Sequence, residues 1–289
     1  MLLSLPFINS FKNKNLELSI KLKEIIGNKG VIVLSKIKTG EIIGCSDINQ
    51  AKQKHTIGSL AKLIDSTALL EEGLITTEDT YYCKGHDNFN GQKIYCWNYN
   101  GHGLMNIQSA LSESCNLFFL NASKRISPVD LLKYYDIYKL NESNQNKNKN
   151  NTTSFKKLAH TSKKNITLGL DKNLKLSSIQ LIGLVNTIAN KGNNLPISER
   201  TMTIVQNGMI ASGQTGTANL LYKTGLNVAA KTGTAPSKSD KTHGWCIGFC
   251  PIKKPEISFC VFIKEGTGFS NAVPVAGKTL KLCKTLNYL

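Results

Sequence analysis

The sequence is poor in three things: long hydrophobic runs, acidic residues and densely spaced cysteines. No stretch approaches the roughly 18 apolar residues that a membrane-spanning helix requires, so we expect no such span. Acidic residues number 19 against 36 lysines and arginines, which gives a net charge of +17. The lysines are dispersed among asparagines and form no basic stripe with aromatics, so we expect no nucleic-acid partner. Eight cysteines in 289 residues are too few for a disulfide framework.

The amino-terminal segment "MLLSLPFINSFKNKN" makes a poor secretory signal. No positive charge precedes its short apolar patch, and no small-residue cleavage site follows it. The route of export therefore cannot be read from the sequence.

Hydrophobic periodicity divides the chain into helical and strand-like segments. Apolar residues at helical spacing predict helices over residues 16–27, 59–73, 102–126, 128–140, 177–192 and 271–286. Runs of β-branched and aromatic residues predict a hairpin over 30–46 and strands over 227–235, 244–251 and 256–266. Strands at both ends and helices in the middle indicate an α/β (α+β) fold, with a five-stranded antiparallel sheet covered by terminal helices and an inserted all-helical lobe.

We expect a single domain, residues 1–289, built from two lobes. The α/β lobe would comprise about 16–60 and 200–289, and the helical lobe about 61–199. Residues 141–165 are polar and repetitive, so burial cannot offset the entropy of ordering them. We predict a flexible insertion there.

A serine followed three residues later by a lysine occurs three times, at Ser35, Ser59 and Ser154. In the predicted hairpin the two side chains would point to opposite faces, and Ser154 lies in the polar insertion. Only Ser59 and Lys62 lie on a predicted helix, where positions i and i+3 share a face. The first turn of a helix also favours developing negative charge, which suits an attacking serine.

Lys62 can act as a base only if its amine is neutral, which requires burial and a second nearby cation. Three copies of Lys-Thr-Gly offer that cation, at residues 38–40, 223–225 and 231–233. The first lies in the hairpin turn and the second precedes a strand. The third lies inside a strand whose bare backbone at Gly233 can accept a peptide as an added strand, so we choose Lys231.

The intervening sequence "SESCN" contains Ser114 and Asn116. Ser114 would pass a proton between Lys62 and a leaving nitrogen, and Asn116 would bind a substrate amide. Each of the three motifs, taken alone, also fits a local role such as a helix cap, a polar helix face or a turn.

Together and in this order, the three motifs resemble those of active-site serine penicillin-recognising enzymes, and the chain resembles the transpeptidase domain of penicillin-binding proteins. The resemblance covers about residues 16 to 286 and includes "VIVLSKIKTGEIIG", "YYCKGHDNFNGQKIYCWNYNGHG", "ALSESCNLFF" and "HGWCIGFCP". Where the family commonly has a proline-glycine-serine turn, this chain reads "HTIGS".

The resemblance implies a role for each motif residue. Ser59 would be the acylated nucleophile and Lys62 its base, with Lys231 tuning the electric field. Thr232 and Thr234 would hold the terminal carboxylate of a D-Ala-D-Ala stem peptide. The backbone N–H groups of Ser59 and Thr234 would form the oxyanion hole.

The implied function is a peptidoglycan D,D-transpeptidase of the bacterial cell envelope that needs no cofactor and binds β-lactam antibiotics covalently. Alternatives are a D,D-carboxypeptidase, a serine β-lactamase, or a non-catalytic β-lactam sensor or inactive paralogue. Relatives generally carry an anchor, pedestal or glycosyltransferase domain, so we expect a membrane-anchored or glycosyltransferase partner if the chain is not a fragment.

Cysteines and histidines cluster between residues 83 and 102. Cys83, His86, Cys96 and His102 are weak candidate zinc ligands, because their spacing matches no standard zinc finger. A Cys83–Cys96 disulfide and free thiols are the other possibilities. We expect His243, beside Trp245, to be structural or part of a cleft wall.

Overall fold

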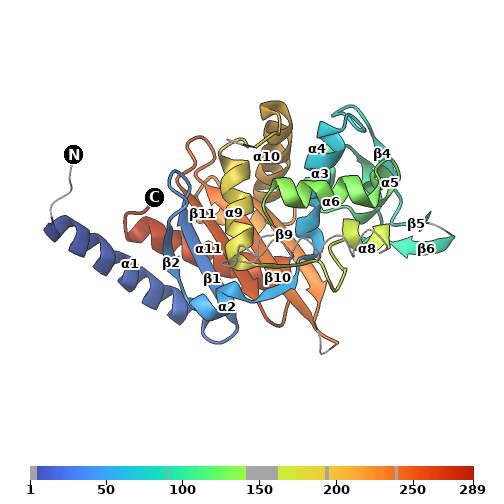
Figure 1. Cartoon of the computed structure of the whole chain (residues 1–289). Helices are drawn as coiled ribbons and strands as arrows, with labels where there is room; N and C mark the ends of the chain where they lie inside the picture. The colour runs from blue at the N-terminus through green and yellow to red at the C-terminus, as the bar shows by residue number, and fades with distance from the viewer. Residues whose placement is uncertain (1–4, 90, 141–161, 193–194, 238–239) are drawn as a thin grey trace, which may run out of the picture.

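A five-stranded antiparallel sheet forms the centre of the computed structural model, which describes residues 5–89, 91–140, 162–192, 195–237 and 240–289. The strand order is β2-β1-β11-β10-β9, so the amino-terminal hairpin pairs with the carboxy-terminal strands (Figure 1). The strands are β1 (Gly30–Lys36), β2 (Ile42–Cys45), β9 (Ala229–Pro236), β10 (Thr242–Cys250) and β11 (Ile257–Ile263). This confirms the predicted sheet.

Both faces of the sheet are buried, which explains why its strands read as continuous hydrophobic runs. In β1, Val31 and Val33 pack into one core, whereas Ile32 and Leu34 pack into the other. Because successive side chains alternate across a strand, an unbroken apolar run supplies both cores at once.

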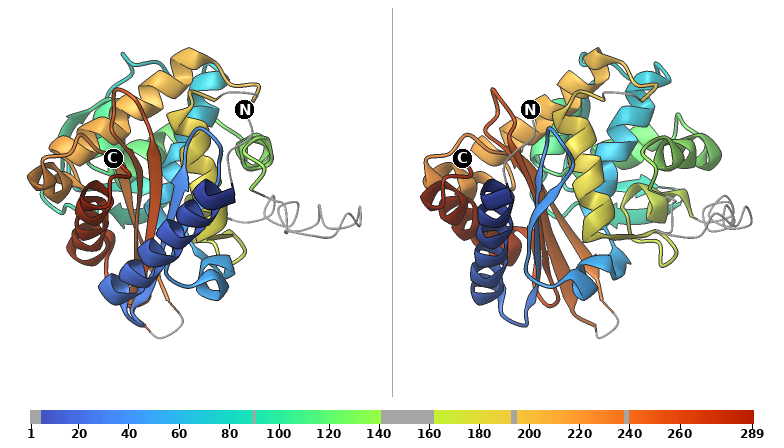
Figure 2. Two further views of the ribbon diagram at one scale, coloured as in Figure 1. Left: turned by 90° about the vertical axis from the view of Figure 1, so that its left-hand side faces the viewer. Right: turned by 60° about the vertical axis from the view of Figure 1, so that its left-hand side comes forward.

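Helices cover each face of the sheet (Figure 2). The terminal helices α1 (Leu5–Ile26) and α11 (Val273–Thr285) lie side by side on one face, as predicted for the two ends of the chain. On the other face α9 (Ser178–Ala189) packs against β1, β10 and β11, and α10 (Glu199–Gln214) packs against β9. Within the described residues, no helix combines the length and the apolar character needed to cross a membrane.

The remaining elements are short helices, helical turns and short strands. The helices and helical turns are α2 (Ile48–Lys52), η1 (Gly58–Leu60), α3 (Ala61–Glu71), α4 (Ile107–Ser112), α5 (Asn116–Ser123), α6 (Pro128–Ile137), α8 (Lys163–Thr167), η3 (Asn219–Thr224) and η4 (Gly268–Ala272). Short strands pair as β3 (Lys54–Thr56) with β8 (Lys175–Ser177), β4 (Tyr81–Cys83) with β7 (Gly103–Met105), and β5 (His86–Phe89) with β6 (Gln92–Tyr95). The lobe predicted to be all-helical thus also carries small two-stranded sheets.

Several predicted boundaries are corrected. The helix expected over residues 102–126 is interrupted: β7 comes first, a capping box at Asn106 begins α4, and the chain breaks before α5. The break lies at Ser114, whose φ of 55° is left-handed and cannot continue a helix. The first helix begins at Leu5 instead of residue 16.

Two further segments differ from the prediction. Most of the predicted flexible insertion, residues 141–161, lies outside the described residues, but its last residues belong to α8. Helix α10 was not predicted, although Met202, Val205 and Met209 are buried at helical spacing. Its glycines and threonines lower helix propensity, and its stability comes from packing. The proposed division into lobes at residues 60 and 200 stays a prediction.

Candidate active site

Ser59 lies in the helical turn η1, immediately before α3, and is placed there by its neighbour Gly58. Gly58 has a φ of +54°, and its amide donates to the carbonyl of Gly169 at 3.0 Å. A Cβ at Gly58 would collide with the backbone of Thr234 in β9. Glycine is therefore required where the turn meets the strand, and the contact sets Ser59 beside the third motif.

The amine of Lys62 lies 3.1 Å from the hydroxyl oxygen of Ser59. Lys62 is fully buried, and its Nζ also contacts the Ser114 carbonyl at 2.6 Å and Asn116 Oδ1 at 2.7 Å. Burial lowers the pKa of Lys62 to about 8. The amine of Lys62 is thus close to losing its proton at neutral pH.

The contacts of Lys62 define what a neutral amine would do there. The Ser114 carbonyl and Asn116 Oδ1 are acceptors only, so they take the two N–H bonds of a neutral amine. The remaining lone pair is then free to accept the hydroxyl hydrogen of Ser59. The arrangement can therefore convert Ser59 into a nucleophile without any other base.

Lys231 approaches the same group from β9. Its buried Nζ lies 2.9 Å from Ser114 Oγ, which is itself 3.3 Å from the amine of Lys62. Burial and the charge of Lys62 lower the pKa of Lys231 well below its usual range. Two amines from distant segments thus converge on one hydroxyl.

The second motif depends on the break between α4 and α5. The left-handed backbone of Ser114 points both its carbonyl and its hydroxyl at Lys62. Asn116 is the first residue of α5, and its Oδ1 bond to Lys62 fixes the orientation of the amide. Asn116 also lines the adjacent cavity, so its NH₂ group is available to a ligand.

The third motif continues along β9. The Thr232 hydroxyl donates to Thr217 Oγ1 at 2.7 Å, and Thr234 Oγ1 accepts from the amide of Gly268 at 3.0 Å. Gly233 packs against η1, where a Cβ would meet the side chain of Leu60 at 3.0 Å. The Lys-Thr-Gly-Thr segment thus forms one wall beside Ser59.

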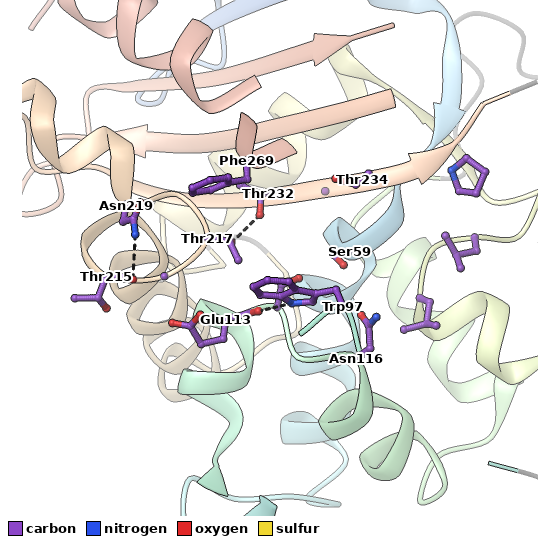
Figure 3. Close-up of a pocket in the computed structure, with 16 residues that line it drawn as sticks. Ser59, Trp97, Glu113, Asn116, Thr215, Thr217, Asn219, Thr232, Thr234 and Phe269 are labelled. Carbon is purple, nitrogen blue, oxygen red and sulfur yellow. Dashed lines mark hydrogen bonds between the residues drawn. The ribbon is translucent and has the colours of Figure 1, made fainter. Parts of the chain in front are cut away.

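A cavity of about 770 Å³ opens beside Ser59, Asn116, Thr232, Gly233 and Thr234 (Figure 3). In Figure 3, Phe269 lies on the β9 side of the cavity and Trp97 with Glu113 on the opposite side. The sequence interpretation missed these three side chains and the residues that follow α10: Thr215, Gly216, Thr217 and Asn219. The "TGT" at 215–217 was the available signal, because small and hydroxyl residues after a helix often line a ligand site.

The segment "HTIGS", which stands where the family commonly has a proline-glycine-serine turn, is held by two side chains of β10. His243 Nε2 lies 2.7 Å from the carbonyl of Thr56, and Trp245 Nε1 donates to the same oxygen at 3.0 Å. His243 and Trp245 are both buried. They anchor the segment before Ser59 to β10, so His243 has the structural role that was predicted.

The other copies of the first and third motifs lie elsewhere. Ser35 is buried in β1, where its hydroxyl accepts from Asn186 at 3.1 Å, and Lys38 is exposed in the hairpin turn. Lys223 is exposed in η3. The pair at Ser154 lies outside the described residues.

Three of the four candidate metal ligands come together, and the fourth does not. Cys83, Cys96 and His102 converge with Cys115, a residue that the sequence interpretation did not include. His86 is instead held in β5, with its ring against Tyr95. All eight cysteines are described and have free thiols, so no disulfide joins Cys83 and Cys96.

Comparison with known proteins identifies the fold and the family. The family model described as the penicillin-binding protein transpeptidase domain matches residues 30–281. Stage V sporulation protein D of Bacillus subtilis is 23% identical in an alignment of 267 residues that covers 78% of this chain and 41% of that protein.

Solved structures of penicillin-binding proteins share the fold. PBP2 from Helicobacter pylori superimposes with a TM-score of 0.81 at 19% identity, over 94% of this chain and 63% of that one. The transpeptidase domain of Burkholderia pseudomallei penicillin-binding protein 3 gives a TM-score of 0.77 at 17% identity, over 96% and 95%. The chain spans less than two thirds of the sporulation protein and of the Helicobacter protein. On the extent of the family match and the shared fold, the chain belongs to the family of penicillin-binding protein transpeptidase domains.

Proposed function

We propose that this chain is a serine acyltransferase that forms an acyl-enzyme at Ser59 with D-Ala-D-Ala stem peptides and transfers the acyl group to a neighbouring stem peptide. The observation that carries the proposal is the 3.1 Å contact between Lys62 Nζ and Ser59 Oγ, with both N–H bonds of a neutral amine directed elsewhere. Covalent binding of β-lactams follows from the same chemistry, because the strained lactam amide takes the place of the peptide bond.

Acylation begins with proton transfer from Ser59 to Lys62. The Ser59 oxygen attacks the carbonyl of the penultimate D-alanine, and the backbone N–H groups of Ser59 and Thr234 stabilise the oxyanion. Lys62 returns the proton through the Ser114 hydroxyl to the leaving amine, and the C–N bond breaks to release D-alanine. A second stem-peptide amine then attacks the ester and regenerates Ser59.

Substrate binding draws on the hydroxyls of β9 and on Asn116. The Thr232–Thr217 pair and Thr234 line the cavity, where their O–H groups suit a terminal carboxylate. The side-chain NH₂ group of Asn116 faces the cavity and suits an amide carbonyl of the bound peptide. Strand β9 is the last strand of the sheet, and its outer edge beside the cavity suits an extended peptide.

The family also suggests where the protein works and with what. We place its activity at the bacterial cell envelope, where peptidoglycan is cross-linked. Among the structural neighbours are a complex of Helicobacter pylori PBP2 with MreC and a peptidoglycan synthase complex. A membrane-associated or glycosyltransferase partner is therefore part of the proposal.

The deciding experiment is covalent labelling with a fluorescent penicillin. The wild-type chain should be labelled, and Ser59→Ala should lose the label. Ser35→Ala is the matched control, because Ser35 also precedes a lysine by three residues yet is buried in β1 away from the cavity. Labelling that persists in Ser59→Ala, or that never appears in folded wild type, contradicts the proposal.

The fate of the label separates the related activities. Slow release of the bound penicillin together with cross-linking of stem peptides supports the transpeptidase. Release of D-alanine with transfer of the acyl group to water alone indicates a carboxypeptidase. Rapid penicillin hydrolysis indicates a β-lactamase. Permanent labelling without processing of stem peptides indicates a sensor or an inactive paralogue.

A further inference from the structure

One carboxylate lines the cavity beside Ser59. Among the described residues that form the cavity wall, Glu113 is the only one with a charged side chain. The Glu113 side chain is half-buried, and within the described part of the chain its carboxylate has no hydrogen-bond or ion-pair partner. Burial raises the pKa of the Glu113 carboxyl group. A partly buried anion without a partner is stabilised by a cation that enters the cavity.

The backbone of Glu113 is held at both of its polar groups. Its amide donates to the Ser109 carbonyl at 2.8 Å, and its carbonyl accepts from Trp97 Nε1 at 2.9 Å. The second bond also holds the exposed Trp97 ring at the cavity wall beside Glu113. Because the face of an indole ring attracts cations, the carboxylate and the ring favour the same kind of ligand.

Two further side chains of the cavity wall offer acceptor atoms to a ligand. The Thr215 hydroxyl donates to the Ala211 carbonyl at 3.3 Å, and the Asn219 NH₂ group donates to the Thr215 carbonyl at 3.4 Å. These bonds leave the lone pairs of Thr215 Oγ1 and Asn219 Oδ1 for a ligand. In Figure 3 both residues and Glu113 lie on the left of the cavity, whereas Ser59 lies toward the right. A primary ammonium, which has three N–H donors and no acceptor, matches this set of oxygen atoms.

This side of the cavity is also the side from which an attacking amine would arrive. In the proposed reaction the Thr232–Thr217 pair binds the terminal carboxylate, so the leaving D-alanine lies on that side of Ser59. By microscopic reversibility, an acceptor amine reaches the ester carbonyl from the side on which the leaving amine departed. Glu113 directly precedes Ser114, the residue proposed to carry the proton of the leaving amine. An acceptor therefore enters past Glu113.

We propose that Glu113, Thr215 and Asn219 form the acceptor subsite and bind the primary ammonium group of a second stem peptide. This inference rests on the proposed function and names the chemical group that the second half of the reaction recognises. The bound ammonium gives one proton to the Glu113 carboxylate, and the resulting amine attacks the ester carbonyl of the acyl-enzyme. As the C–N bond forms and the C–O bond breaks, a second proton passes from the nitrogen through Ser114 to the Ser59 oxygen. Glu113 then releases its proton to water.

Tryptophan fluorescence gives a readout of acceptor binding that does not depend on acylation. The chain has two tryptophans, of which Trp245 is fully buried and Trp97 is exposed at the cavity wall. The probe is a synthetic stem peptide with a free ammonium group, titrated into the full chain carrying Ser59→Ala. The same peptide with its amine acetylated should bind at least about tenfold more weakly, because it has lost the charge that Glu113 recognises.

Glu113→Gln, added to the same protein, keeps the shape of the side chain and removes its charge. It should weaken binding of the ammonium peptide at least about tenfold. The matched control Glu41→Gln should not, because Glu41 is exposed between β1 and β2 and does not line the cavity. Unchanged affinity in the Glu113 variant, or equal binding of the two peptides before that change, overturns the subsite. If circular dichroism shows that the Glu113 variant does not fold, the comparison of the two peptides decides.

Acyl transfer in the protein with Ser59 intact provides a second readout. The acyl-enzyme formed from a stem-peptide donor is offered either the ammonium peptide or hydroxylamine, a nucleophile that is uncharged at neutral pH. Glu113→Gln should lower transfer to the ammonium peptide at least about tenfold more than transfer to hydroxylamine. Equal losses with both acceptors overturn the role of Glu113 in recognising the ammonium. Binding of the ammonium peptide without any penicillin labelling of the wild type instead counts against acylation at Ser59, so the two failures are distinguishable.

Discussion

Lys62 of α3 and Lys231 of β9 share the hydroxyl of Ser114, at 3.3 Å and 2.9 Å. Neither amine is exposed to solvent, and no carboxylate pairs with either one in the described part of the chain. Two buried amines beside one hydroxyl are not both stable as ammonium ions, because burial and mutual repulsion disfavour the second charge. The pair is thus able to hold a neutral base next to Ser59.

Removal of one amine should slow acylation without unfolding the protein. Lys231→Ala removes the amine that contacts Ser114 Oγ and leaves a space beside Lys62, so we expect acylation to fall by about 10²–10⁴-fold. Lys223→Ala is the control, because Lys223 begins another Lys-Thr-Gly but is exposed in η3. Stopped-flow measurement of penicillin acylation checks this, and equal rates in both variants would contradict it.

Acylation should depend on pH in the direction set by Lys62. Since burial lowers the pKa of Lys62 to about 8, the amine is protonated below that pH and neutral above it. The acylation rate should therefore rise about tenfold per pH unit up to about pH 8 and then level off. A rate that is flat between about pH 6 and pH 9, or that falls with rising pH, argues against Lys62 as the base.

Gly58→Ala should be more damaging than an ordinary change from glycine to alanine. The added methyl group would meet the carbonyl of Thr234, and the backbone would have to keep a φ of +54°. We expect a loss of about 1–3 kcal/mol in the free energy of unfolding and at least about tenfold slower acylation. Gly73→Ala is a control for the conformational cost, because its φ is also positive but nothing lies within 4 Å of a Cβ there.

Chemical denaturation of the two glycine variants separates strain from collision. The Gly73 variant should lose stability and retain its acylation rate, whereas the Gly58 variant should lose both. Normal acylation in the Gly58 variant would show that the contact between η1 and β9 does not set the geometry of Ser59.

Asp65→Asn should stabilise the fold near neutral pH. Both carboxylate oxygens of Asp65 are buried without a hydrogen-bond partner among the described residues, and burial raises the pKa of Asp65 well above its usual value. Between that usual value and the raised one, the unfolded chain releases the proton and the folded chain keeps it, so stability falls as pH rises.

The Asp65→Asn variant removes the pH dependence of stability that Asp65 causes. Its gain over wild type should be about 1 kcal/mol at pH 7 and should shrink toward about pH 4, where the carboxyl group is protonated in both states. Urea denaturation at several pH values measures it. A variant that is less stable than wild type at pH 7 would show that the Asp65 carboxylate is ionised and paired with Lys62.

Thr217→Val tests a residue that carries no recognised motif. The valine keeps the shape but removes the oxygen that accepts from Thr232, so the Thr232 hydroxyl loses its fixed direction. We expect about fivefold to fiftyfold weaker processing of carboxylate-bearing substrates. The control variant Thr203→Val should be unchanged, because Thr203 is a half-buried residue of α10 that does not line the cavity. Equal effects on a stem peptide with an amidated terminus would argue against carboxylate binding.

Sequence patterns predicted the sheet well because burial of both faces requires long apolar runs, as in β11. The same reasoning failed at the break between α4 and α5. Helical periodicity continues through Glu113–Cys115, and the left-handed Ser114 makes its contacts with Lys62 and Lys231, which are distant in sequence. Small two-stranded sheets such as β4–β7 were also not predicted. Three-residue strands carry too little periodic signal to be recognised.

The motif residues of the candidate site were predictable, because the order of the three motifs along the chain added to the spacing within each. Ser59, Lys62, Ser114 and Lys231 do lie together, although each motif alone occurs elsewhere or fits a local role. The sequence did not predict Thr217, Trp97 and Phe269, because only the three-dimensional fold brings their segments to the cavity. Cys115 escaped as a possible ligand because it belongs to a distant motif, and no spacing rule distinguishes His86 from His102.

The seam between β9 and the helices beside it has a mechanical consequence. The Ser114 hydroxyl is held from one side by an α3 lysine and from the other by a β9 lysine. A shift of roughly 1 Å between the sheet and that helical layer would stretch the contact between Lys231 and Ser114 beyond hydrogen-bond length, while the contact between Lys62 and Ser114 moves with the helices. A partner that binds on either side of this seam would therefore change the rate of the acylation that we propose at Ser59.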